Sequence, residues 1–490
     1  MASPSSGLNV SESSEDKAPT EKLHKAAGLT IASAVTGGLR DLLVLFALGR
    51  SRRSDGFFAL FLVTQFLYTV AVGGHLITLG RIAGLGRKVR THFFHAKFAP
   101  RLRRMSIVCV VVVLPMMKFV YEQSWLAASV IAALSAGLLI CRGQAEFRSY
   151  IAISEALNTA MLAAIWQNVL IIVAAVGCWL AGIQNLAVIV VGIVLGFAAQ
   201  AFHLRKWAPG LRARGVNNVV EHEVSWEVSS RELLWFGGPA LESLMMGGLP
   251  GGVYSILVMA RRIAVTIPIS FAVPLGFRLI SDSHDEAKSR SNGAQVMQSV
   301  SVLVIIGLAI VQAALVVLRM LAFAEHRKMS LGPIAKFDLP TLLPLTAAIA
   351  LGSICFALHH ALSRYQQALG DERRAVVTTA IATGAQIAGV LVGVLLKSVL
   401  FVGITFSLAW LMASIRDITF VTRWRYLERD LRTVLVWFPL LFVITSTVVV
   451  RAPFTSPGME VLIWTEGCLP LLAYFWGFQQ ARRGSQGSWI

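Results

Sequence analysis

The segment from Leu39 to Phe61 reads LRDLLVLFALGRSRRSDGFFALF, which is an apolar stretch, a short polar turn and a second apolar stretch. A helix needs about 20 mostly apolar residues to cross a hydrocarbon layer about 30 Å thick. The segment therefore contains the end of one predicted membrane span, residues 26–48, and the start of the next, residues 57–79. Two charged residues, Arg40 and Asp41, lie well inside the first of these spans.

The composition extends this prediction to the whole chain. The 490 residues have a mean hydropathy of +0.68, and 56% of them are hydrophobic while only 14% are charged. These values exclude a set of soluble domains and indicate an integral membrane protein. The net charge of +18 is assigned to loops beside the membrane, so no nucleic-acid partner is expected.

The predicted fold is an all-α polytopic membrane protein with about 14 transmembrane helices. It has two six-helix bundles, residues 26–204 and 233–421, and an extra helix pair at 433–479. Between and around them we expect a disordered cytoplasmic tail at 1–25, a cytoplasmic linker at 205–232 and a cytoplasmic tail at 480–490. The predicted spans are 26–48, 57–79, 105–120, 125–140, 156–183, 186–204, 233–249, 253–279, 300–318, 342–362, 375–396, 399–420, 434–450 and 459–478.

Loop charge predicts the orientation of these spans, because Lys and Arg accumulate on the cytoplasmic side. With the amino terminus inside, the cytoplasmic segments hold 31 of the 44 basic residues, the opposite face holds 10, and 3 are intramembrane. This asymmetry predicts an even number of spans with both termini cytoplasmic.

Sequence signals for covalent chemistry are missing. There is no GxxxxGK[ST], HExxH or GxSxG sequence, and the five cysteines lie singly in or beside apolar runs. We therefore expect no enzyme activity, no cofactor, no metal site and no disulfide framework. Energy for any transport would come from a gradient of H⁺ or Na⁺, from a partner, or from the concentration difference of the substrate itself.

The intramembrane charges are the candidate site, because a charge at the bilayer centre costs about 2.5 to 3.5 kcal/mol on insertion scales. Arg40 and Asp41 form either a local ion pair or an interhelical bridge, or they face the substrate. Arg261 and Arg262 interrupt the eighth span, and we favour a functional role for Arg261. Glu242 lies among glycines and prolines in the seventh span, where it either binds a coupling cation or pairs with one of the arginines.

Two pairs of histidines are further candidates, one for a metal site and one for proton transfer. His92 and His95 lie in a strongly basic loop that would repel a metal cation, and we interpret them as solvated residues. His359 and His360 lie near the cytoplasmic end of the tenth span. We interpret them as interfacial histidines, with proton transfer as the alternative.

The stretch from Leu39 to Phe61 resembles the start of the MurJ/MviN lipid II flippases, which belong to a superfamily with polysaccharide exporters and MATE transporters. Arg40, Asp41, Gly49, Asp55, Phe57 and Phe58 match the family pattern without a gap. Weaker matches are Gly238-Pro239-Ala240 and the segment ALSRYQQALGDERRAV at 361–376. Further arginines of the family correspond here to Ala34, Tyr68 and Thr69.

The resemblance implies a flippase for a polyprenyl-pyrophosphate-linked saccharide, either a peptidoglycan precursor or an exopolysaccharide unit, working by alternating access. Arg40 and Arg261 would attract the pyrophosphate, and Asp55 would hold the outer turn through polar contacts. Asp41, Glu242 and Arg262 would be coupling or structural charges. The alternatives are a MATE-like antiporter of small organic cations and a scaffold that recruits polysaccharide synthesis or polymerisation enzymes without transporting anything.

Overall fold

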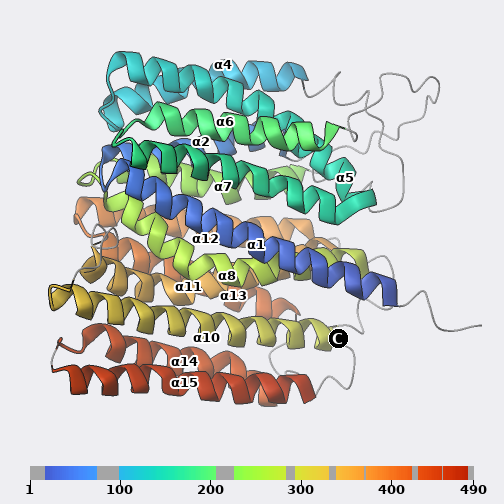
Figure 1. Ribbon diagram of the computed structural model, residues 1–490. Helices are drawn as coiled ribbons and strands as arrows, with labels where there is room; N and C mark the ends of the chain where they lie inside the picture. The colour runs from blue at the N-terminus through green and yellow to red at the C-terminus, as the bar shows by residue number, and fades with distance from the viewer. Residues whose placement is uncertain are drawn as a thin grey trace, which may run out of the picture.

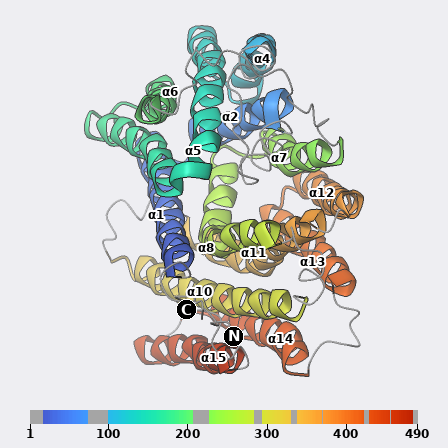
Figure 2. The same cartoon turned by 90° about the vertical axis from the view of Figure 1, so that its right-hand side faces the viewer.

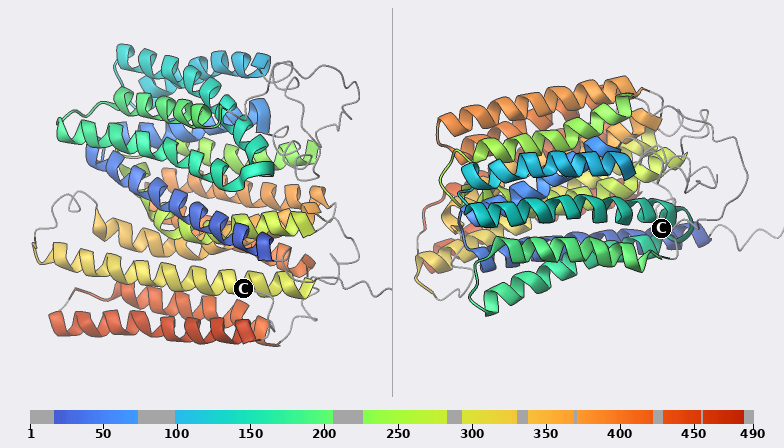
Figure 3. Two further views of the ribbon diagram at one scale, coloured as in Figure 1. Left: turned by 45° about the vertical axis from the view of Figure 1, so that its right-hand side comes forward. Right: turned by 90° about the horizontal axis from the view of Figure 1, so that it is seen from above.

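The computed structural model describes residues 17–73, 99–205, 226–282, 293–329, 338–368, 371–421, 429–454 and 456–483. Within these ranges the regular structure is helical. The helices lie side by side along one direction, from α4 at one edge of the molecule to α15 at the other (Figure 1). Views from two further directions show the same arrangement (Figure 3). A bundle of this kind satisfies backbone hydrogen bonds within each helix, as a bilayer requires.

The amino-terminal half forms one group of helices, the N-lobe. Its second and third segments each end in a five-residue π-helical turn. The elements are α1 (Lys17–Leu48), α2 (Arg52–Tyr68) with η1 (Thr69–Gly73), α4 (Ala99–Pro115) with η3 (Met116–Val120), α5 (Trp125–Leu180) and α6 (Leu186–His203).

The second half forms the C-lobe and the extra pair. In Figure 2 the pair lies beside α10, at the side of the molecule away from α4 and α6. The C-lobe elements are α7 (Trp226–Met246), α8 (Val253–Asp282), α10 (Gly293–His326), α11 (Leu339–Ala368), α12 (Glu372–Leu395) and α13 (Val399–Val421), and the pair is α14 (Arg429–Arg451) and α15 (Pro457–Arg483).

Helix α5 accounts for two of the predicted spans. Its 56 residues would extend about 84 Å if straight, which is far longer than a bilayer is thick. Figure 2 shows α5 doubling back near its middle, and the apolar stretches Trp125–Ser149 and Leu162–Leu180 lie on either side of that bend. The loop expected between spans 125–140 and 156–183 is therefore helical.

Over its described residues, each of the 14 predicted spans coincides with a helical segment, which confirms the predicted fold class. Among the described residues, eight segments are long and apolar enough to cross a membrane by length and composition. The short predicted span 105–120 begins earlier, at Ala99, and continues through Pro115 into η3. The break near Lys397 is a turn in which that residue has φ 53°.

Two predicted boundaries are wrong. The tail expected to be disordered over residues 1–25 is helical from Lys17, and the linker expected at 205–232 is helical from Trp226. Polar residues continue a helix without cost where it leaves the hydrocarbon, so hydropathy marks the bilayer rather than the helix ends. Residues 1–16, 206–225 and 484–490 of the predicted tails and linker, and His92 and His95, lie outside the described residues.

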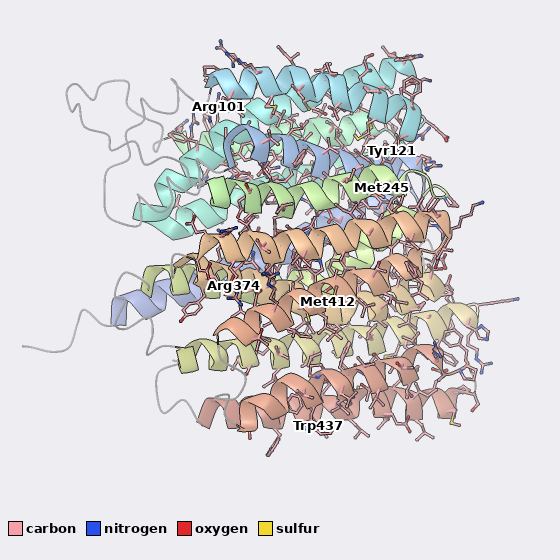
Figure 4. The ribbon with its side chains drawn as sticks, turned by 180° about the vertical axis from the view of Figure 1, so that it is seen from behind. Arg101, Tyr121, Met245, Arg374, Met412 and Trp437 are labelled. Carbon is pink, nitrogen blue, oxygen red and sulfur yellow. The ribbon has the colours of Figure 1, made fainter. Side chains whose placement is uncertain are left out.

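The two lobes meet along α1 with α8 and along α2 with α7. We call the end at which α1 stops and α2 starts the outer end, following the predicted orientation, and the opposite end the inner end. Figure 4 shows Tyr121 and Met245, from opposite lobes, at the outer end and Arg374 toward the inner end. The predicted site residues lie on the four helices of this contact.

Candidate functional site

The first part of the candidate site is a three-residue charge cluster between α1 and α8. Arg40 Nε donates to Asp41 Oδ1 over 2.7 Å, and Arg262 Nε lies 2.6 Å from Asp41 Oδ2. Asp41 is fully buried, while the Arg262 side chain is 39% exposed. Because Asp41 belongs to the N-lobe and Arg262 to the C-lobe, this ion pair joins the two lobes inside the membrane.

Arg40 is enclosed within the N-lobe. Its Nη1 donates to Asn168 Oδ1 over 3.0 Å, and its guanidinium lies 4.9 Å from the centre of the Phe61 ring. The residue is only 4% exposed. Of the two roles considered for Arg40 and Asp41, the structure contains the local ion pair, and an anion could bind Arg40 only by displacing these contacts.

The second part of the candidate site surrounds Glu242 on α7. Its Oε1 lies 2.6 Å from Arg261 Nη1, and its Oε2 accepts from Gln386 Nε2 over 2.5 Å. Gln386 in turn accepts a hydrogen bond of 3.0 Å from Trp410 Nε1. Glu242 thus pairs with an intramembrane arginine, which is the alternative to cation binding that the sequence left open. Helix α7 continues without a break through Pro239.

Arg261 retains unused hydrogen-bonding capacity. Its guanidinium lies 4.6 Å from the centre of the Phe406 ring, and the side chain is 16% exposed. Two of its nitrogens, Nε and Nη2, are buried and have no hydrogen-bond partner in the part of the chain that the structure describes. Buried donors without partners are costly, and a guanidinium fork fits phosphate oxygens well. Arg261 therefore has the chemistry of an anion-binding group.

The five predicted charges together leave an excess of positive charge. Arg40, Arg261 and Arg262 face two carboxylates, Asp41 and Glu242. Arginine stays protonated in proteins, so the charge of this group is positive when both carboxylates are ionised. Such a group attracts anions and opposes the entry of a cationic substrate.

Asp55 is not part of this central group, because it lies at the outer end. It follows the N-cap Ser51 of α2, and its carboxylate receives donors from the start of α8. Gly252 N–H donates to Oδ2 and Ser255 N–H donates to Oδ1, both over 2.7 Å, and the Ser255 hydroxyl donates to Oδ1 over 2.5 Å. Asp55 of the N-lobe thus caps a helix of the C-lobe and holds the two outer turns together.

Further contacts close the outer end. The Tyr121 hydroxyl, at the end of η3, donates to the Ser243 carbonyl of α7 over 2.8 Å, and both residues are fully buried. Gly252 has φ +87°, and a Cβ on it would lie 2.2 Å from Arg50 Cγ. The positive φ and the close approach both require glycine here. The structure is therefore a state with its outer end closed.

The interfacial interpretation of His359 is wrong. Its side chain is fully buried, its Nδ1 lies 2.6 Å from Asp417 Oδ2, and its Nε2 lies 2.9 Å from Thr379 Oγ1. His360 is partly buried, and its Nδ1 has no hydrogen-bond partner. Hydropathy could not predict that His359 is buried, because its partner Asp417 lies 58 residues further along the chain.

Sequence reasoning also missed the polar partners Asn168 and Gln386, because single amides in an apolar helix show no spacing pattern. The Tyr68 ring has a guanidinium from another helix beside it, since Arg142 lies 5.0 Å from the ring centre. In the described residues no cluster of three or more His, Cys, Asp or Glu could hold a metal ion. The five cysteines are free thiols.

These features define an all-α, multi-pass membrane protein of two lobes and an extra helix pair, and solved structures show which fold this is. No protein-family model and no curated protein sequence matches the chain. Its structure is similar to that of the lipid II flippase MurJ in an inward closed conformation, with a TM-score of 0.65 and 13% identity over 94% of this chain and 99% of MurJ.

Two further solved structures share this fold. One is an inward-facing multidrug resistance MATE transporter, with a TM-score of 0.59 and 14% identity over 81% of this chain and 99% of that chain. The other is a transporter of the MOP superfamily from Pyrococcus furiosus, whose binding pocket is described as having reverse polarity. It has a TM-score of 0.53 and 14% identity over 85% of this chain and 97% of that chain. The predicted resemblance is thereby confirmed at the level of the fold.

Proposed function

We propose that this protein is a flippase that moves a polyprenyl-pyrophosphate-linked saccharide across the bacterial cytoplasmic membrane, with both termini cytoplasmic. The fold is one used by a lipid II flippase and by MATE transporters. No covalent chemistry is involved. The saccharide and the diphosphate would pass between the lobes, while the lipid chain stays in the bilayer.

One observation supports an anionic substrate above all others. Arg261 lies on α8, one of the two C-lobe helices that contact the N-lobe, and its Nε and Nη2 are buried donors without partners among the described residues. A diphosphate oxygen could accept from this edge of the guanidinium while Nη1 keeps its ion pair with Glu242. Arg262, which is 39% exposed, would add a second positive charge beside it.

Alternating access requires the lobes to exchange which end is closed. At the closed outer end, Asp55 binds the start of α8. In the central charge group, the Asp41–Arg262 ion pair joins α1 to α8. An anion between the lobes would compete with Asp41 for Arg262, so substrate binding would weaken one of the contacts that hold the lobes together. H⁺ and Na⁺ are the candidate coupling ions.

The MATE-like alternative predicts carboxylates free to bind an organic cation. Here Asp41 and Glu242 are both occupied by arginines, which disfavours that alternative. The scaffold alternative predicts no transport of either kind of substrate. Its partners would be enzymes of polysaccharide synthesis or polymerisation.

Transport of a fluorescent polyprenyl-pyrophosphate saccharide in proteoliposomes tests the proposal. A membrane-impermeant glycosidase added outside reports which leaflet the saccharide occupies. The variant to compare is the double substitution Glu242→Gln with Arg261→Gln, because it removes the guanidinium without leaving a buried carboxylate unpaired. Arg53→Gln is the control, since Arg53 is exposed and donates to the Gln184 carbonyl of its own lobe.

We expect wild type and Arg53→Gln to transport equally and the double variant to lose at least about tenfold in rate, because about 1.4 kcal/mol of lost binding corresponds to a factor of ten. Equal transport by the double variant would remove Arg261 from the site. Transport of a small organic cation instead of the lipid-linked saccharide would favour the antiporter, and transport of neither would favour the scaffold.

A further inference from the structure

A buried polar network lies in the C-lobe, apart from the charges discussed so far. At its centre is His359 on α11, whose ring contacts Asp417 of α13 and Thr379 of α12. Gln366, two turns further along α11, donates to the other oxygen of Asp417 over 2.9 Å. All four of these side chains are fully buried. Three helices therefore meet at one imidazole ring.

The hydrogen bonds around His359 define its protonation. The Thr379 hydroxyl donates its single hydrogen to the Ala375 carbonyl over 2.8 Å, so its oxygen can only accept from His359 Nε2. An ionised Asp417 can only accept from Nδ1. Both ring nitrogens thus face acceptors, and this geometry suits the doubly protonated imidazolium paired with a carboxylate.

The charges around the network leave one proton exchangeable. Arg231 Nη1 lies 2.6 Å from Glu232 Oε1, and Arg364 Nη2 lies 3.1 Å from the same oxygen. The two guanidinium groups thus share the Glu232 carboxylate, and Arg231 also interacts electrostatically with Asp417, so these two cations and two carboxylates balance without the imidazole. The proton on His359 is therefore the one that can leave without an excess of negative charge.

Other ionisable groups lie on the helices around His359, including Glu372, Arg373 and Arg374 at the start of α12. His360 follows His359 on α11 and interacts electrostatically with Arg231 and Arg364. Its Nδ1 has no hydrogen-bond partner among the described residues. Helix α12 presents the uncharged Thr379. On α8 and α10, Arg261 and Arg319 form ion pairs with Glu242 and Glu460.

The network lies close to a contact with α7, one of the two C-lobe helices that meet the N-lobe. Ser363, one turn after His359 on α11, accepts from Arg231 Nη2 of α7 over 2.6 Å. Helix α7 packs against α2 so closely that a Cβ on Gly237 would lie 3.0 Å from the Phe66 ring. Helix α7 is thus held on one side through Arg231, in its inner half, and Ser363, and on the other side it contacts α2 near its middle and η1 of the N-lobe.

Loss of the proton would weaken this attachment. A charge-assisted hydrogen bond is roughly twice as strong as a neutral one, so the contacts of His359 with α12 and α13 weaken when the ring becomes neutral. Without its proton, Nε2 could accept a hydrogen bond from the Thr379 hydroxyl, but only after that hydroxyl turned away from the Ala375 carbonyl. Proton release therefore loosens the packing of α11 against its two neighbours.

We propose that His359 and Asp417 form a proton-binding site of the C-lobe, and that its occupancy controls how α7 packs against the N-lobe at the inner end. The ligand is H⁺, bound between the imidazole and the carboxylate. This goes beyond the proposed function, because it assigns a coupling ion and a place where that ion binds, away from Arg261.

Distance measurements between spin labels on the full-length protein in phospholipid nanodiscs test this proposal. Val70 on η1 and Val377 on α12 are exposed positions in the inner halves of opposite lobes, and cysteines at both report how the lobes pack there. Leu126 and Leu395 are exposed positions at the outer end and provide the matching outer pair. Unsubstituted protein taken through the same labelling gives the background from native cysteines.

The pH is varied from about 5 to about 9, a range that spans the ordinary titration of histidine. We expect the inner distance distribution of the wild-type protein to shift with a one-proton titration curve. His359→Gln and Asp417→Asn should each give one distribution at all pH values. His360→Gln is the matched control, because it removes the neighbouring imidazole and should leave the titration in place.

An inner distance that does not change with pH in the wild-type protein would overturn the proposal, and this result needs no substitution to fold. Titration that persists in His359→Gln, or that disappears in His360→Gln, would also overturn it. Transport of the lipid-linked saccharide together with an inner distance that does not change with pH would refute the proton site and leave the proposed function standing. A pH response without transport of the lipid-linked saccharide would refute the proposed function alone.

Discussion

Replacing Asp55 by Asn should open the outer end of the protein. The Asp55 carboxylate receives three donors from Gly252 and Ser255 at the start of α8, and it is 2% exposed. The substitution keeps the shape of the side chain, removes its charge and turns one acceptor oxygen into a donor. The contact between α2 and α8 should then become much weaker while each lobe remains folded.

The size of the effect follows from these contacts. Hydrogen bonds to a charged group contribute about 1.5 to 3 kcal/mol each and neutral ones about 1 kcal/mol. The asparagine oxygen can keep one bond, and the bonds are not additive, so a loss of about 3 kcal/mol is expected. Since about 1.4 kcal/mol is a factor of ten, the population with an open outer end should rise about a hundredfold.

Thiol accessibility measures this population. Ser243→Cys places a thiol at a fully buried position on α7, and it leaves the backbone carbonyl that accepts from Tyr121 unchanged. In nanodiscs, a membrane-impermeant maleimide should react with this thiol about a hundredfold faster when Asp55→Asn is also present. Arg53→Gln, on the same turn, is exposed and should not change the rate. Equal rates in the Asp55→Asn and unsubstituted backgrounds would refute the assignment of Asp55 as the residue that closes the outer end.

Three other substitutions have expected outcomes. Arg319→Met should destabilise the protein by about 3 to 5 kcal/mol, because it leaves Glu460 buried without its bidentate partner. Replacing both Arg319 and Glu460 by Met should recover most of the loss. Thermal unfolding in detergent measures both effects. Gly252→Ala should accelerate the thiol reaction described above, since its φ of +87° and a contact of 2.2 Å with Arg50 both oppose a Cβ; an unchanged rate would show that the turn adapts. Glu242→Gln should tighten binding of a short prenyl pyrophosphate about tenfold in calorimetry, because it removes the charge that competes for Arg261. Weaker binding would mean that the Glu242 carboxylate positions Arg261.

The fold could be predicted from the sequence because a bilayer imposes a length on apolar helices. Each predicted span corresponds to a helical segment, including the short one that contains Pro115. The positions of helix ends could not be predicted in the same way. Helix α1 starts at Lys17 and α5 continues through its bend, because polar residues outside the hydrocarbon are compatible with a helix.

The sequence identifies the charged residues of the candidate site, but it does not decide between their possible pairings. Arg40, Glu242 and Arg261 were identified because charges are rare in membrane spans. Their partners come from distant helices: Asn168 is 128 residues from Arg40, and Gln386 is 144 residues from Glu242. Only the packing of the helices determines which carboxylate neutralises which arginine. The substrate-binding roles of these residues stay predictions.

The burial of His359 depends on a contact that no periodicity reveals. A Cβ on Gly352 of α11 would lie 2.4 Å from Ser407 Cα, so α11 and α13 approach closely at this glycine. This approach brings Asp417 within reach of the imidazole. Without it, a histidine near the end of an apolar span is most simply interpreted as interfacial, and that interpretation was wrong.

The attachment of α14 and α15 has a consequence for how the protein moves in its bilayer. Arg319 binds Glu460 and the carbonyls of Val449 and Ala452, which fixes this pair to α10 and makes it part of the C-lobe. Among the described residues, one side of the molecule then has eight α-helices, and the other has five, of which α5 supplies two of the predicted spans. Viscous drag from lipid increases with the size of the embedded body, so the smaller lobe should swing further when the two rock against each other. Local thinning and curvature of the surrounding lipid should therefore concentrate around α4 and α6, at the edge of the molecule opposite the pair (Figure 2).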